Sequence, residues 1–255
     1  MLKQLKTGFF SYFKAVTFIN QYRLWKAVLL PSFISLSIFI ALLVIALIFA
    51  PDVTTPLTEW ILAKLEGSWV GDFLAGLVSF LVRAITLLFF FLLYKSFMLN
   101  VMSPILSLVA DKVGEVLHGK KEKEAFEFVP FAKEILLGTW DALLLFLKET
   151  AIVLLILILS LFIPLLSPFT AVIIFLVQSY FVGLSMLDLS ASYKKYSMRE
   201  LKAQRKTYKS FALGNGMAFT LLFFIPILGV LIAPSVGVVA ACLGMEENNS
   251  DEAII

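Results

Sequence analysis

The sequence predicts an all-α, polytopic membrane protein with two long transmembrane helices, two helical hairpins and a cytoplasmic helical extension. Of the 255 residues, 60% are hydrophobic and 15% are charged, whereas a soluble domain is about half apolar and about a quarter charged. The apolar residues are gathered in long blocks that contain no charge. The apolar content excludes a disordered chain, and the single cysteine excludes a disulfide scaffold. The composition therefore disfavours a water-soluble enzyme.

The first half of the chain predicts an interfacial helix and two membrane-spanning helices. Residues 1–26 hold aromatic residues among scattered lysines and no acid, which predicts an amphipathic helix at the membrane surface. Residues 27–50 are free of charge and long enough for a span, which needs about 20 apolar residues. No cleavage site follows them, so we expect no cleaved signal peptide. Residues 73–101 form the second predicted span, interrupted by Arg83 and Lys95.

The second half contains two apolar blocks that are too long to be single spans. Residues 150–187 and 210–245 are charge-free runs of 38 and 36 residues. A straight helix of that length would be about 57 Å long, against a hydrocarbon core of about 30 Å. Pro164 lies near the middle of the first run and Pro226 near the middle of the second, each within a Phe-Ile-Pro sequence. We predict two helical hairpins with arms of about 14–18 residues; re-entrant half-helices and short tilted spans both fit.

The charges between the blocks predict the orientation. Residues 1–26, 102–149 and 188–209 hold five, six and seven Lys or Arg, whereas residues 52–72 hold one Lys and four acids. The positive-inside rule then places both termini in the cytoplasm and residues 52–72 outside. The hairpins return the basic segment 188–209 to the cytoplasmic side. We therefore expect a multi-pass protein of the inner (plasma) membrane.

The segment 104–149 predicts a largely cytoplasmic helical pair. Ser103 and Pro104 have the chemistry of a helix start, and Gly119 ends the first helix. A charged tip follows, and a second helix begins near Pro130 and continues into the first hairpin arm. Residues 246–255 form an acidic tail.

No set of residues in the sequence predicts catalysis or metal binding. His118 is interpreted as a solvated helix-end residue and Cys242 as a small packed side chain. Four acids between residues 111 and 124 are interpreted as a solvated face: Asp111, Glu115, Glu122 and Glu124. We expect a protein that is not an enzyme and that uses no cofactor and no metal.

Three features favour transport of an anion, each with an alternative. Arg83 inside an apolar span marks a pathway, a structural ion pair or a snorkelling side chain. Ser167 and Ser235, each beside a proline, would begin the returning hairpin arms, whose N-termini suit anions, or would only reverse the chain. Asn20, Arg23 and Lys26 gather before the first span and would bind an oxyanion or anchor a lipid headgroup. The basic segment 188–209 favours anionic lipid over nucleic acid.

Several short motifs, in order, resemble the family of CysZ sulfate permeases and etoposide-induced membrane proteins. They are Gly8-Phe9-Phe10-x-Tyr12-Phe13, Leu29-Leu30-Pro31, Ser103-Pro104 with Ala110-Asp111, Phe162-Ile163-Pro164, Asp188, Met198-Arg199-Glu200-Leu201, and Gly214 before Ile225-Pro226. The resemblance implies two long transmembrane helices, two helix pairs that enter the membrane only partly, and an oligomer that conducts sulfate inward for cysteine synthesis.

The chain departs from the pattern of this family at the implied sulfate site. The family's Gly/Pro loop before the first span is missing, its Arg-Arg pair falls on Trp25-Lys26, and Arg23 is the candidate substitute. Lysine does not replace arginine fully, because arginine offers a planar fork of donors.

Together these observations predict a permease or channel for a small inorganic anion, with sulfate favoured. Its expected partners are that anion, the lipid bilayer and further copies of the chain, without nucleic acid. The alternative is a scaffold without transport that binds lipid or protein through the basic segment 188–209 and the helical pair.

Overall fold

The computed structural model describes residues 1–64, 73, 76–77, 80, 98–99, 101–119, 128–163, 167–191, 196, 198–225 and 228–252. The chain divides into two compact units, of which unit 1 is Met1–Leu36 with Leu99–Ile255 and unit 2 is Ser37–Met98. Throughout these described ranges the regular secondary structure is helical, which confirms the predicted fold class.

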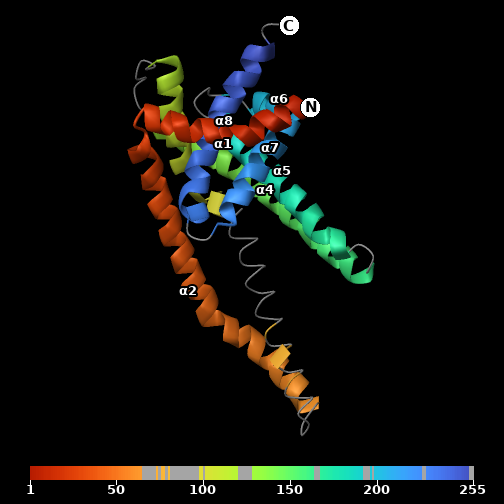
Figure 1. Cartoon of the computed structure of the whole chain (residues 1–255). Coiled ribbons are helices and arrows are strands. Elements are labelled where there is room, and N and C mark those ends of the chain that lie inside the picture. Colours follow the sequence, from red (N-terminus) through yellow and green to blue (C-terminus); the bar gives the residue numbers. More distant parts are fainter. Residues whose placement is uncertain are drawn as a thin grey trace. The chain divides into compact units, whose positions relative to one another are not determined.

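The helices follow one another along the chain as Figure 1 labels them. They are α1 (Leu2–Gln21), α2 (Trp25–Lys64), α4 (Phe128–Phe162), α5 (Ser167–Ala191), α6 (Met198–Thr207), α7 (Lys209–Phe223) and α8 (Leu228–Glu252). Residues 101–118 are also helical. Four segments are long and apolar enough to cross a membrane: Trp25–Val44, Trp140–Ser160, Pro168–Ala191 and Gly229–Asn248. The chain is therefore a multi-pass membrane protein.

The two predicted transmembrane helices differ in how much of them is described. The first, over residues 27–50, lies within α2. The second, over residues 73–101, lies mostly outside the described residues. Several described large apolar side chains of unit 2 are exposed, among them Ile40, Val44, Ile48 and Trp60, as expected of a surface that faces lipid.

The first hairpin has one arm longer than predicted. α4 and α5 pack against each other and run side by side in Figure 1, with 35 and 25 residues. α4 begins at Phe128 and has Pro130 in its first turn, as the sequence predicted. The length of α4 agrees with the prediction that the helix from Pro130 continues into the first arm. α5 is longer than the predicted 14–18 residues, and its helix continues beyond the charge-free run through Asp188 to Ala191.

The second hairpin is asymmetric. α7 has 15 residues, within the predicted range, whereas α8 has 25 and extends through most of the acidic tail to Glu252. The end of α8 contacts other helices of unit 1. Lys14 Nζ of α1 lies 2.6 Å from Glu247 Oε2, and His118 Nε2 lies 3.5 Å from Glu246 Oε1. The tail is thus helical and ion-paired, and His118 ends its helix next to Gly119, whose φ is +81°.

The start predicted for that helix at Ser103 is not observed. Residues 101–103 are already helical, so Ser103 lies inside the helix. Proline near the first turn permits a helix start but does not require one, because a helix can also continue into it from the preceding turn.

α7 lies at the centre of unit 1 and packs against α1, α5 and α8. Small residues bring α5 and α7 into backbone contact, because a Cβ on Gly183 would fall on the carbonyl oxygen of Ala212. A Cβ on Gly216 would likewise fall on the carbonyl oxygen of Ser179. Small residues spaced by four on both helices are typical of close packing between membrane helices.

α1 lies on this bundle with one face and leaves the other exposed. Gly8 is packed on the backbone of α7, and the buried face of α1 continues through Ser11, Tyr12, Ala15 and Ile19. Phe10, Phe13 and Val16 are exposed on other faces. α1 is not among the four candidate spans, and its interfacial position stays a prediction.

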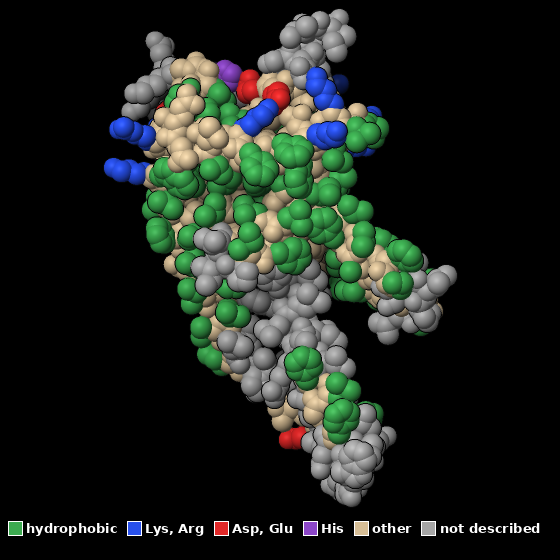
Figure 2. All heavy atoms as spheres, viewed as in Figure 1, with side chains coloured by type: hydrophobic (Ala, Val, Ile, Leu, Met, Phe, Trp, Pro, Cys, Tyr) green, Lys and Arg blue, Asp and Glu red, His purple; other side chains and the backbone are tan. Residues whose placement is uncertain are grey.

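Polar and apolar side chains separate on the surface of unit 1. Figure 2 shows Lys and Arg side chains at one end of this unit and hydrophobic side chains over the adjoining band. The inside of the unit is also apolar, with Tyr208, Phe211, Phe219 and Phe223 among its largest fully buried side chains.

Candidate functional site

The predicted anion entrance lies in the turn between α1 and α2. The amide of Arg23 donates to the carbonyl of Asn20 (3.4 Å), and the amide of Leu24 donates to the carbonyl of Ile19 (3.0 Å). These two bonds form a Schellman motif, which ends a helix with a left-handed residue. Arg23 is that residue, with φ +56°. The backbone thus takes the conformation that a glycine favours, although no glycine is present.

The three predicted entrance residues are close in sequence and exposed. Asn20, Arg23 and Lys26 all lie on the surface. Asn20 Oδ1 accepts a hydrogen bond of 2.7 Å from Trp25 Nε1, which fixes the amide of Asn20 against the first turn of α2. Within the described part of the chain, the guanidinium of Arg23 and the ammonium of Lys26 have no ion pair. The turn therefore presents two cations and an amide donor next to an apolar span.

The remaining predicted site residues have different outcomes. Arg83 lies outside the described residues. Ser167 is the first residue of α5, which places it at a helix start within the one-residue uncertainty of such boundaries.

Ser235 is not at a helix N-terminus, so this prediction is wrong. α8 begins at Leu228 and contains Pro234 in its interior. A proline inside a helix leaves the carbonyl four residues earlier without its bond, and here the hydroxyl of Ser35 in α2 donates to that carbonyl, of Val230, at 3.0 Å. Ser235 is fully buried, with its hydroxyl 3.4 Å from that of Ser32. Neighbouring hydroxyls commonly satisfy backbone groups freed by proline in membrane helices.

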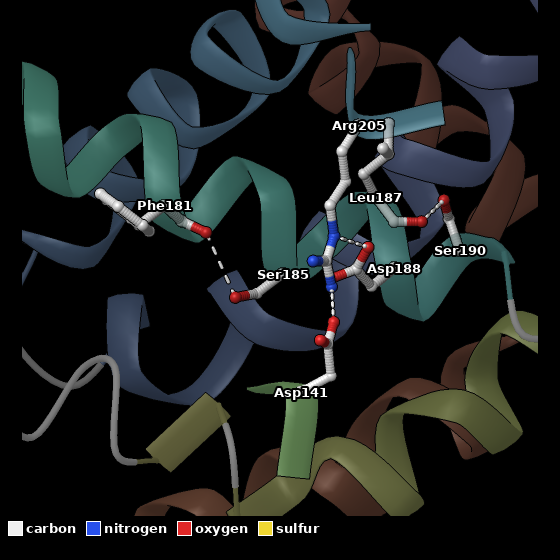
Figure 3. A network of polar contacts seen from close by, with 7 residues as sticks. All are labelled: Asp141, Phe181, Ser185, Leu187, Asp188, Ser190 and Arg205. Carbon is white, nitrogen blue, oxygen red and sulfur yellow. Dashed lines mark hydrogen bonds and ion pairs between the residues drawn. The ribbon is translucent and has the colours of Figure 1, made fainter. Parts of the chain in front are cut away.

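A charged cluster that the sequence did not single out joins three helices. Arg205 of α6 donates from Nε to Asp188 Oδ1 (2.8 Å) and from Nη2 to Asp188 Oδ2 (2.7 Å). The same Nη2 also donates to Asp141 of α4. Figure 3 shows the guanidinium between the two carboxylates, with Asp188 on α5. Between 15% and 20% of each side chain is exposed. We call these three residues the charge cluster.

Hydrogen bonds hold the three residues of the charge cluster together, but their formal charges do not cancel. Burial alone would lower the pKa of Arg205, but the hydrogen bonds and charges of Asp188 and Asp141 raise it above its ordinary value. Two carboxylates against one guanidinium leave one negative charge. One signal in the sequence could have found the cluster. Asp188 directly follows a charge-free run of 38 residues, and a charge at such a position needs a partner.

Other chemistry is limited in the described ranges. No group of three His, Cys, Asp or Glu side chains there is placed to hold a metal ion. Cys242 is not part of a disulfide and is fully buried in α8, as interpreted from the sequence.

The comparison with known families decides the membership of this chain. Residues 11–234 match the family described as sulfate transporter CysZ/etoposide-induced protein 2.4. The chain belongs to this family. No curated protein matches the chain. The match of this CysZ/etoposide-induced family member begins inside α1 and ends inside α8, so it covers the entrance turn, the charge cluster, the first hairpin and the second hairpin as far as the first turns of α8.

Proposed function

We propose that this protein is a permease or channel that conducts a small inorganic anion, with sulfate the favoured substrate, through the membrane. The observation that carries the proposal is the cationic turn at Arg23 and Lys26, located at the start of an apolar span in a member of a sulfate-transporter family. In this proposal the anion is conducted passively.

In this mechanism the turn attracts and orients the anion before it loses water. The guanidinium of Arg23 offers planar paired donors to two oxygens of an oxyanion. Lys26 adds a second positive charge, and Asn20 adds amide N–H donors because its carbonyl oxygen is already bonded to Trp25. The attraction is between exposed groups, so it weakens at high salt.

Uptake of sulfate by vesicles that contain the purified protein tests this proposal. We expect the wild type to take up sulfate and the double variant Arg23→Gly with Lys26→Ala to lose affinity about ten-fold, because a hydrogen bond to a charged group contributes about 1.5–3 kcal/mol. Glycine is the better substitution at residue 23, because it removes the guanidinium and keeps the left-handed turn.

Matched variants test whether the loss of uptake is specific to the entrance residues or follows from the loss of any positive charge. Lys14→Ala removes an exposed cation of α1 that pairs with Glu247, and we expect it to leave uptake unchanged. Arg23→Lys keeps the charge but loses the paired donors, so its uptake should lie between those of wild type and Arg23→Gly. Unchanged uptake in the double variant would overturn the entrance, and absence of uptake by the wild type would overturn the function.

A second candidate function is lipid binding without transport, and α6 favours it. Arg199, Lys202 and Lys206 are exposed on this ten-residue helix, whereas Arg205 is directed inward to the charge cluster. A basic surface helix attracts anionic headgroups. If this function holds, the wild type takes up no sulfate, and replacement of the three exposed cations by Gln weakens its binding of anionic lipid. A permease with no lipid role would take up sulfate and would bind anionic lipid equally well with and without these cations.

We also propose that copies of the chain assemble. In the apolar windows of α2 and α4, 22% and 17% of the residues are buried, against 78% in α8. These peripheral helices thus leave apolar faces for lipid or for a second copy. Crosslinking in native membranes, before detergent is added, would distinguish the two.

A further inference from the structure

Two buried polar side chains near the packing of α1 against α7 and α8 have no hydrogen-bond partner among the described residues. Tyr12 of α1 is 8% exposed and Asn215 of α7 is fully buried. Within the described part of the chain, neither the hydroxyl of Tyr12 nor either side-chain polar atom of Asn215 has a hydrogen-bond partner. Buried polar groups are nearly always paired, and an unpaired one needs an explanation.

The contacts of neighbouring glycines place both residues at one junction. The backbone nitrogen of Asn215 lies 2.9 Å from the point that a Cβ on Gly8 would occupy, one turn of α1 before Tyr12. The hydroxyl of Tyr12 lies 2.7 Å from the corresponding point on Gly237 of α8. Phe219 follows Asn215 by one turn of α7, and its ring lies 3.3 Å from that same point on Gly237.

The chemistry of the junction suits an oxyanion. Tyr12 supplies an O–H donor and Asn215 supplies two N–H donors. Burial raises the pKa of the Tyr12 phenol, so the phenol keeps its proton and its ability to donate. After the Tyr12 hydroxyl, the nearest atoms to the same point on Gly237 are the thioether sulfur of Met186 and the ring of Phe219.

Neutral donors also suit a pathway better than a buried cation would. Conduction requires binding that is strong enough for the ion to enter and weak enough for it to leave. In a medium of low dielectric constant, a fixed positive charge would hold a divalent anion strongly, whereas a phenol and an amide replace part of its hydration shell without trapping it.

We infer that Tyr12 and Asn215 form an internal contact site for the conducted oxyanion, reached after the entrance turn. The inference rests on the proposed function, since it assigns a second binding point to the same path. It also explains why these two buried polar side chains lack hydrogen-bond partners among the described residues.

Sulfate uptake by vesicles containing Tyr12→Phe or Asn215→Leu tests the inference. We expect each variant to fold and to take up sulfate about ten-fold more slowly, because each loses a donor to a charged ligand. The matched control is Asn248→Leu, which replaces another buried asparagine of unit 1, one whose Nδ2 is already bonded to the carbonyl of Gly244 at 2.8 Å. Its uptake should stay near that of the wild type.

A purely structural role gives the opposite result. If the buried polar atoms of Tyr12 and Asn215 only destabilise the fold, Tyr12→Phe and Asn215→Leu raise the melting temperature and leave uptake unchanged. That result would overturn the inference. If the wild type itself takes up no sulfate, the proposed function fails first and the inference fails with it.

Thiol labelling decides the matter if Asn215→Leu does not fold. The native thiol is removed with Cys242→Ala, and Asn215→Cys is then treated with a small, charged, water-soluble thiol reagent. We expect labelling that sulfate slows. A thiol at position 215 that is never labelled in protein that conducts sulfate would contradict the inference, because a conducted anion and the reagent need the same hydrated route.

Discussion

Arg205→Met removes the one cation of the charge cluster and is the most informative change to stability. Methionine replaces the apolar stem of arginine and lacks the guanidinium, so the change removes the charge and the donors while it keeps most of the apolar packing. Asp188 loses two hydrogen bonds and Asp141 loses one. Two carboxylates then remain side by side at 15–20% exposure, repelling each other between α4, α5 and α6.

The expected loss of unfolding free energy is about 3 kcal/mol. Removing one partner of a buried ion pair costs about 3–5 kcal/mol, and the partial exposure of this cluster places it at the lower end. For a chain of this size, 1 kcal/mol corresponds to about 2–4 °C. The melting temperature of Arg205→Met should therefore fall by about 6–12 °C.

Thermal unfolding of the purified protein in detergent measures this effect, and neutral variants of the carboxylates give its internal control. Asp188→Asn should be milder than Arg205→Met, and Asp141→Asn mildest, because it loses one bond and leaves a neutral Arg–Asp pair. Combining all three substitutions should recover more than half of the loss, since no unpaired charge remains. The charge cluster does not hold the three helices together if Arg205→Met has the melting temperature of the wild type, or if the triple variant has the lowest melting temperature of the set.

Three further stability predictions follow from backbone contacts. Ser35→Ala leaves the carbonyl freed by Pro234 without its hydroxyl donor and should lower the free energy of unfolding by about 1–3 kcal/mol. Adding Pro234→Ala should restore much of this loss, because alanine returns a backbone N–H to the helix. A double-variant cycle measures the coupling between the two changes. Gly183→Ala places a Cβ on the backbone of α7 and should prevent correct folding, judged by gel filtration, whereas Gly76→Ala, with open space around it, should not. Gly119→Ala should cost about 1 kcal/mol through strain at φ +81°, despite open space; an unchanged melting temperature would contradict this.

The positions of the helices were largely predictable, because the signals that set them are local. Charge-free runs predicted the span in α2 and both hairpins, and Gly119 ended its helix as predicted. Ser235 was misplaced because a proline inside an apolar run has two outcomes. A proline begins a helix when no donor is available for the carbonyl four residues earlier. It remains inside a helix when a hydroxyl such as that of Ser35 donates to that carbonyl. That hydroxyl lies 195 residues away in sequence.

The candidate site was predictable only in part, for the same reason. Asn20, Arg23 and Lys26 are six residues or fewer apart, so their proximity follows from the sequence; the left-handed turn that presents Arg23 does not. The charge cluster takes its members from α4, α5 and α6, and the Tyr12–Asn215 junction takes its members from α1 and α7. Neither set shares a local pattern, and each exists only because the helices pack.

The sequence by itself determined that this is an all-α membrane protein, because hydropathy and charge act residue by residue on the choice between lipid and water. Its ordered motifs, and the match over residues 11–234, place it in the sulfate transporter CysZ/etoposide-induced family. The tertiary structure decided which polar groups are paired. It paired Arg205 with two carboxylates and brought the hydroxyl of Ser35 to the carbonyl freed by Pro234. Among the described residues it left the polar side-chain atoms of Tyr12 and Asn215 without hydrogen-bond partners. Pairing depends on which atoms lie within about 3 Å of one another, and in a helical bundle those atoms come from distant parts of the chain.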